Sequence, residues 1–302
     1  MIEVLHAGLC DLVVDQGRPG LGALGMPVGG AADAQALIAA NRLVGNEDTA
    51  AGLEFTLMGP RLRFPSGGMV ALTGARFAAS RSNGGPVTWN ETLMLGEGEV
   101  LTLGQVEIGC RCWLALQGGV TVPEVMGSRS TFLPAGFGGY QGRPLRQGDR
   151  LTSGMLLSDV HMMRATPPVS VDGPLRVVAG PQIHQFDNDG LAALFSAPFK
   201  VVAASDRRGL RLAGAAVSHA QLELPSQGVM PGAIQVPPDG QPIILGWDGP
   251  VTGGYPVVAG VISADWPRLA QLKPGDVVRF VTIEQERARQ LAKETWKIEA
   301  LA

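Results

Sequence analysis

The sequence predicts a mainly β protein that folds as two domains with a few short helices. Its length of 302 residues suits two domains of ordinary size. The 42 glycines and 22 prolines are scattered between short segments rich in Val, Leu and Ile, so turns recur at intervals of roughly eight to twelve residues, which is typical of a β-barrel or sandwich. Few stretches show helical periodicity. No apolar run reaches the roughly 18 residues that a membrane-spanning helix needs, so no membrane span is expected.

The charge balance excludes one class of partner. Lys and Arg number 24 against 27 Asp and Glu, so the chain lacks the basic excess that nucleic-acid binding requires. Charged residues make up only 17% of the sequence, which indicates either a surface covered by another subunit or a compact barrel with small polar loops. Three cysteines and the absence of a basic secretory n-region predict a reducing, cytoplasmic compartment.

The first half of the chain opens with a strand at 2–14 that bends at Gly8. A helix follows at 31–44, where Asp33 is placed to cap the start and Gly45-Asn46 supplies the left-handed stop. A run of strands comes next, at residues 61–64, 69–72, 99–103 and 112–116.

A proline-rich stretch at 165–174 interrupts the periodicity and is the best boundary candidate, which predicts domains at 1–165 and 166–302. The second domain is again rich in strands, with a short helix at 191–195 and another that begins at Asp265. A charged terminal helix is expected at 284–299. The predicted strands of this domain are 175–179, 199–203, 243–245, 257–262 and 277–282.

Several common enzyme motifs are missing or out of context. Residues 20–25 match G-x-G-x-x-G, but Pro27 and Gly29-Gly30 stand where the helix of a dinucleotide site should run. No P-loop, H-E-x-x-H or G-x-S-x-G sequence occurs, so any ATP must be bound without a P-loop from this chain. Cys110-Arg111-Cys112 has no second Cys or His pair at zinc spacing, which favours a strand over a metal site.

Two segments and one histidine are candidates for chemistry. Residues 205–211 gather four charges in a chain that uses few, and arginine can fork onto a carboxylate or a phosphate, although a solvated hairpin tip explains the cluster equally well. Residues 252–256 offer backbone amides without side chains, a hydroxyl and an aromatic ring, which suit an oxyanion or a flat ligand; a plain turn is the alternative. His184 follows a Gly-Pro turn and is either a general acid or base or a structural residue.

Ordered motifs along nearly the whole chain carry a family resemblance. In the first half they are Gln16-Gly17-Arg18-Pro19-Gly20, Gly29-Gly30, Asp33, Leu43-Val44-Gly45-Asn46, Gly127-Ser128-Arg129-Ser130-Thr131, Gly138-Gly139 and Gly142-Arg143. In the second half they are Gly180-Pro181, Ser205-Asp206-Arg207, Gly209, Arg211, Pro231-Gly232-Ala233-Ile234-Gln235-Val236-Pro237-Pro238-Asp239-Gly240 and Thr252-Gly253-Gly254-Tyr255-Pro256. Together they resemble the family of the 5-oxoprolinase C subunit, also called allophanate hydrolase subunit 2 or the biotin-dependent carboxyltransferase-like family.

The resemblance implies two cyclophilin-like β-barrel domains and a complex with the family's B and A subunits, the latter binding 5-oxoproline. That complex opens the lactam to glutamate with ATP, whereas related fused proteins transfer a carboxyl group from carboxybiotin to urea. A carboxyltransferase subunit that uses biotin from another protein is therefore the alternative, and a non-catalytic regulatory binding subunit is the second alternative. Both reactions act on an amide-like carbonyl, which calls for backbone amides and arginine charge around the developing oxygen anion.

The resemblance places the site in the second domain. This sequence departs from the family pattern at Arg208 and Leu210, where Met and Tyr are usual, and at 249–251, where a more polar stretch is usual. These departures bear on the identity of the ligand rather than on the location of the site. The expected catalytic residues are Asp206, Arg207, Arg211, Thr252 and Tyr255, and the expected substrate-binding residues are His184, Gln235, Pro237, Asp248, Gly253 and Gly254, with no metal ligand.

Overall fold

The computed structural model describes residues 1–154, 161–168, 173–220, 224–294 and 296–301. Contacts between residues divide the chain into two compact units. Unit 1 comprises Met1–Arg18, Gly29–Pro168 and Thr295–Ala302, and unit 2 comprises Pro19–Val28 and Val169–Glu294. The segment 19–28, near the N-terminus, thus belongs to unit 2, and the segment 295–302, at the other end of the sequence, belongs to unit 1.

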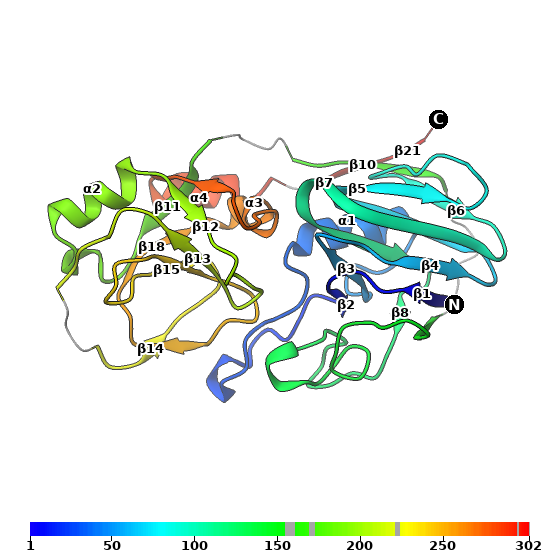
Figure 1. The fold of residues 1–302 in the computed structure, drawn as a ribbon, viewed down its shortest axis with the longest axis horizontal. Coiled ribbons are helices and arrows are strands. Elements are labelled where there is room, and N and C mark those ends of the chain that lie inside the picture. The colour runs from blue at the N-terminus through cyan, green and yellow to red at the C-terminus, as the bar shows by residue number, and fades with distance from the viewer. Residues whose placement is uncertain (155–160, 169–172, 221–223, 295, 302) are drawn as a thin grey trace. The chain divides into compact units, whose positions relative to one another are not determined.

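Unit 1 is built on a nine-stranded sheet in the order β2-β3-β7-β4-β1-β9-β8, with β5 paired to β7 and β6 to β5 (Figure 1). Two long strands, β5 and β7, form its most extensive antiparallel pair. The strands are β1 (Ile2–His6), β2 (Asp11–Val14), β3 (Gly52–Thr56), β4 (Arg61–Phe64), β5 (Gly68–Arg81), β6 (Thr92–Leu95), β7 (Glu99–Leu116), β8 (Val120–Thr121) and β9 (Arg150–Ser153).

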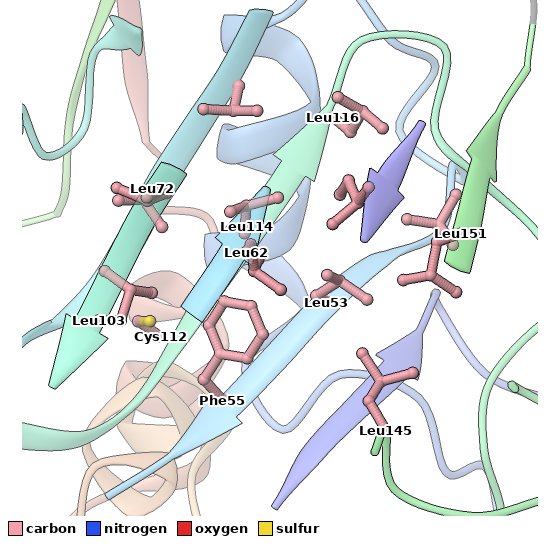
Figure 2. Packing of buried hydrophobic residues seen from close by; sticks show 14 of the residues in the cluster. Leu53, Phe55, Leu62, Leu72, Leu103, Cys112, Leu114, Leu116, Leu145 and Leu151 are labelled. Carbon is pink, nitrogen blue, oxygen red and sulfur yellow. The ribbon is translucent and has the colours of Figure 1, made fainter. Parts of the chain in front are cut away.

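The core of unit 1 lies on the inner face of this sheet, where Leu53, Phe55, Leu62 and Leu114 are fully buried (Figure 2). Helix α1 (Ala34–Leu43) begins as expected, because the carboxylate of Asp33 accepts a hydrogen bond from the backbone amide of Ala36 in its first turn. The helix packs on β5 and β7.

A buried polar network in unit 1 accounts for several of the resemblance motifs. The carboxylate of Asp15 accepts hydrogen bonds from the hydroxyls of Ser128 and Ser130, both at 2.6 Å. The guanidinium of Arg18 donates to the carbonyl oxygens of Ser130 at 2.7 Å and of Val125 at 3.0 Å. These motifs therefore hold the glycine-rich segment after β8 in place.

Unit 2 contains an eight-stranded sheet in the order β19-β12-β13-β16-β15-β18-β11-β20. Strands β19 and β20 are separated in sequence by Arg279 alone and yet lie at opposite ends of this order, so the sheet curls until it is nearly closed. Its strands are β11 (Leu175–Ala179), β12 (Phe199–Val201), β13 (Gly209–Ala213), β15 (Ala233–Gln235), β16 (Ile243–Leu245), β18 (Val257–Val261), β19 (Val277–Val278) and β20 (Phe280–Thr282).

Helices and a separate ribbon complete the described part of unit 2. The helices are α2 (Asn188–Ser196), α3 (Trp266–Ala270) and α4 (Gln285–Leu291). The ribbon pairs β14 (Gln227–Gly228) with β17 (Thr252–Gly253). The prediction of a mainly β chain with two barrel-like sheets and a few short helices is thus confirmed. Over the described ranges, none of the helices has the length and hydrophobicity needed to cross a membrane.

The expected terminal helix at 284–299 is wrong in its second half. Helix α4 ends at Leu291, and β21 (Lys297–Ala300) pairs antiparallel with β10 (Met163–Thr166) in unit 1. The cause is packing, because Trp296 and Ile298, two residues apart, contact the apolar cluster beneath α1, and this spacing of two is the period of a strand. The predicted strands at 99–103 and 112–116 likewise belong to the single strand β7.

Candidate functional site

The predicted charge cluster at 205–211 forms the turn before β13 and the first residues of that strand. Arg207 is 8% exposed and pairs through its guanidinium with the carboxylate of Asp248, which is 3% exposed. Nε of Arg207 donates to Oδ2 at 2.8 Å and Nη2 to Oδ1 at 3.2 Å, so the pair is bidentate. The backbone amide of Asp248 donates in turn to the carbonyl oxygen of Arg207 at 3.1 Å. Two of the predicted site residues, 41 positions apart, are therefore each other's partners.

The other charges of this segment have different roles. Asp206 is exposed, and its Oδ1 accepts a hydrogen bond from the backbone amide of Arg208 at 2.7 Å, which stabilises the turn. Arg211 lies on β13 opposite Ile243, and it is exposed, as is Arg208. Of the two arginines that were predicted to be catalytic, Arg211 is thus the one open to a ligand from solvent.

The glycine-rich segment 252–256 starts in the β14–β17 ribbon, where Gly253 lies opposite Gln227. Thr252, Gly254 and Tyr255 are exposed, the last by 46%. The buried carboxamide of Gln235 lies beneath the segment and donates from Nε2 to the carbonyl oxygen of Tyr255 at 3.3 Å. The structure therefore brings Gln235 together with the segment.

Gly253 packs against the carboxamide of Gln235. A Cβ atom at this position would lie 2.6 Å from Nε2 of Gln235, which is closer than real Cβ contacts occur. A Cβ at Gly254 would lie 3.3 Å from the carbonyl oxygen of Leu224, a tight contact that a small shift relieves. A side chain at position 253 would therefore displace the end of the Gln235 side chain, whereas Gly254 leaves the backbone open on its exposed side.

His184 and Pro237 belong to a neighbouring feature of unit 2. His184 lines a cavity of about 530 Å³, whose other lining residues are Gln185, Phe186, Asp187, His219 and Ala220. The ring nitrogens of His219 lie 3.0 Å from the carbonyl oxygen of Ala220 and 3.3 Å from that of Pro237. Pro237 thus contributes a backbone oxygen rather than a side chain.

The carboxylate of Asp187 is held in its charged form at the rim of this cavity. The hydroxyl of Ser218, the backbone amide of Gly190 and the charge of His219 lower the pKa of Asp187 below its usual range. Asp187 also caps helix α2, which gives its charge a structural reason. That the charges at 206–211 face the glycine-rich segment stays a prediction.

Sequence reasoning missed Gln182 and Gln227, whose carboxamides hydrogen-bond each other at 2.9 Å. Gln182 lies two positions before His184, and no motif of known spacing includes it. A lone glutamine gives no signal in a sequence, because this residue is common on any surface.

With this geometry in view, comparison with known proteins assigns the fold. A family described as the carboxyltransferase domain, subdomains A and B, matches residues 24–282. The chain belongs to this carboxyltransferase domain family. The match takes in most of both units, including the Arg207–Asp248 pair and the glycine-rich segment.

Relatives of this carboxyltransferase domain fall into two groups. The chain is 39% identical to the C subunit of 5-oxoprolinase from Escherichia coli over 289 residues, which are 95% of this chain and 93% of that protein. It is 34% identical to urea amidolyase of Lachancea kluyveri, covering 96% of this chain but only 17% of that protein. The crystal structure of the K. lactis urea amidolyase superimposes with a TM-score of 0.85 at 31% identity, over 96% of this chain and 19% of that one.

Proposed function

We propose that this chain is the C subunit of a 5-oxoprolinase complex, which opens 5-oxoproline to glutamate with ATP. The observation that carries this proposal is the 39% identity to the E. coli subunit over almost the full length of both chains. The substrate's amide carbonyl would meet the exposed backbone at Gly254 and Tyr255, whose amides would stabilise negative charge that develops on its oxygen.

Urea carboxylation is the second candidate, favoured by the 34% identity to a urea amidolyase. The exposed ring of Tyr255 and the open backbone at Gly254 suit a flat group with hydrogen-bonding edges, such as the ureido ring of biotin. Bound there, that group would supply the carboxyl. It would arrive on another protein, since this sequence contains no Met-Lys-Met biotinylation site.

The activity is assigned by two assays on the chain co-purified with its partner subunits. The first measures ATP-dependent glutamate release from 5-oxoproline, and the second measures transfer of an isotopically labelled carboxyl group to urea. Glutamate release supports the proposal, and transfer to urea without glutamate release replaces it by the second candidate. Intact partner binding with neither activity contradicts both and indicates a regulatory binding subunit.

We also propose that the chain works only with partners, the B and A subunits of the complex, in the cytoplasm. The complex would use ATP, and any ATP would be bound without a P-loop from this chain. The low charge content supports a covered surface. Cys10, Cys110 and Cys112 form no disulfide, which suits a reducing compartment.

Co-expressed with the B subunit, the chain is expected to elute as one heteromer at low micromolar concentration. A specific interface of more than about 1,200 Å² survives purification at such concentrations. Size-exclusion chromatography with light scattering measures the assembly. Separate elution of the two chains would contradict the heteromer.

Replacing Arg211 by alanine is expected to lower the activity of the complex by about tenfold to a hundredfold. This range corresponds to loss of a charge-assisted hydrogen bond worth roughly 1.5–3 kcal/mol in the transition state. Arg208→Ala is the matched control, because Arg208 is an exposed arginine three positions earlier, in the turn before β13. A lower melting temperature in place of lower activity would show that Arg211 is structural.

Replacing Gly254 by valine is expected to block approach to the backbone and to abolish most of the activity, with little loss of folded protein. The neighbouring carbonyl of Leu224 must move by a few tenths of an ångström, and the melting temperature measures the cost of this shift. Activity and the melting temperature are measured together. Full activity in folded Gly254→Val complexes would place the site elsewhere.

A further inference from the structure

Three glutamine carboxamides attach the glycine-rich segment to the barrel of unit 2. Gln235, at the end of β15, donates to the carbonyl oxygen of Tyr255 in the middle of the segment. Gln182 accepts a hydrogen bond at Oε1 from the backbone amide of Val257, just after the segment, at 3.1 Å. Its Nε2 donates to Oε1 of Gln227, which lies in β14 directly opposite Gly253. The segment is therefore held at its beginning, its middle and its end.

These hydrogen bonds have to order a flexible stretch of backbone. A Gly-Gly pair loses more conformational freedom on ordering than other residues, and the β14–β17 ribbon supplies only two residue pairs to hold it. Gln182 joins both ends of the segment through one side chain, because it contacts Val257 directly and Gly253 through Gln227. Gln182 therefore helps to fix the backbone of the glycine-rich segment, which would face a substrate.

The carboxamide of Gln227 is not fully satisfied. Its Nε2 is buried and has no hydrogen-bond partner among the residues that the structure describes. A buried donor without an acceptor destabilises a fold, and an apolar side chain would avoid this cost. The presence of glutamine here is therefore better explained by the link from Gln182 to β14 than by the stability of unit 2.

We propose that Gln182 and Gln227 are positioning residues, which fix the backbone at 253–255 for reaction at an amide carbonyl. The inference rests on the function proposed above for that reaction. Neither residue needs to touch the substrate. Their removal is expected to slow the chemical step while leaving substrate affinity nearly unchanged, because the backbone donors remain present but lose their fixed orientation.

The test compares Gln182→Met and Gln227→Met with a matched control, Gln241→Met. Methionine keeps the length of glutamine and removes its hydrogen bonds. Gln241 also makes two side-chain hydrogen bonds within unit 2, from Gly214 N at 2.9 Å and to Gly214 O at 3.4 Å, and both lie away from the segment. For each complex, kcat, KM, the melting temperature and backbone hydrogen exchange of residues 252–257 are measured.

The expected result is a kcat lowered about tenfold in Gln182→Met and about threefold or more in Gln227→Met, a KM within about twofold of the native value, and faster exchange at 252–257. Gln241→Met should match the native complex in all three. Unchanged kcat, or an equal loss in the control, would overturn the proposal. If the native complex is inactive in both assays, the proposed function fails, and exchange alone decides: faster exchange supports the positioning, and unchanged exchange refutes it.

Discussion

Replacing Arg207 by alanine is expected to destabilise unit 2 by about 3–5 kcal/mol, since it leaves the buried carboxylate of Asp248 without its partner. The side chains of this pair are only 7% and 1% exposed, so water cannot take the place of the lost guanidinium. The pair also joins the turn before β13 to the turn after β16, and both turns loosen together. Asp248→Ala should cost a similar amount for the converse reason.

The double variant Arg207→Met/Asp248→Leu is the control for this prediction. Apolar side chains of similar size remove both charges at once, so no buried charge is left unpaired and much of the lost stability should return. Calorimetry and urea unfolding measure the differences. Single variants no less stable than the double would contradict the expected penalty. A folded double variant without activity would show that Arg207 or Asp248 also acts on the substrate.

Replacing Asp11 by asparagine is expected to stabilise the protein at pH 8 and to leave its stability near pH 4 almost unchanged. Asp11 lies opposite Phe55, which in turn lies opposite Cys112, so all three side chains share the core face of the sheet. Burial raises the pKa of the Asp11 carboxyl from 3.8 to about 7, and its Oδ1 has no hydrogen-bond partner within the described part of the chain.

The pH range follows from these two pKa values. Below pH 3.8 the carboxyl is protonated in both the folded and the unfolded chain, and its contribution to stability is complete. Between this pH and about 7 only the unfolded chain loses the proton, so stability falls with rising pH. A shift of this size corresponds to about 4 kcal/mol as an order of magnitude, all of which Asp11→Asn should recover at pH 8.

Thermal unfolding of the native and Asp11→Asn proteins between pH 4 and pH 8 tests this expectation. Some pH dependence should persist in the variant, because burial also raises the pKa of Asp33, to about 6. Asp48→Asn is the control of opposite sign, since the hydrogen bond from Arg42 lowers the pKa of Asp48. A melting temperature at pH 8 that Asp11→Asn fails to raise would contradict the prediction.

Local signals in the sequence predicted local structure well. The cap at Asp33, the stop at Gly45, whose φ is 73°, and the break between β1 and β2 near Gly8 are all in the structure. Each depends on the residue itself and its immediate neighbours. By contrast, β21 depends on β10, more than a hundred residues earlier in the chain, and the charges around it suggested a helix. Long-range pairing of this kind leaves little trace in a single segment.

At the candidate site, too, local features could be predicted from the sequence and long-range partners could not. A chain with few charges was expected to satisfy its clustered arginines with a ligand or a carboxylate, and for Arg207 the partner is the carboxylate of Asp248. Which carboxylate would do so could not be predicted, because the partner lies on a different turn. Gln182 was missed for the same physical reason, since its importance comes from the two strands it joins and not from its own sequence context.

The near closure of the second sheet sets an order for folding during synthesis. Strand β20 pairs in parallel with β11, with Leu175 opposite Phe280, so the barrel can close only after Phe280 has been synthesised. Strand pairing in unit 1 is completed even later, because the partner of β10 is the strand at 297–300, which leaves the ribosome after β20. Although the chain has two compact units, neither completes its strand pairing early. These edges of β10 and β11 therefore stay unpaired until the strands at 280–282 and 297–300 have been made, and chaperone protection matters most in that interval.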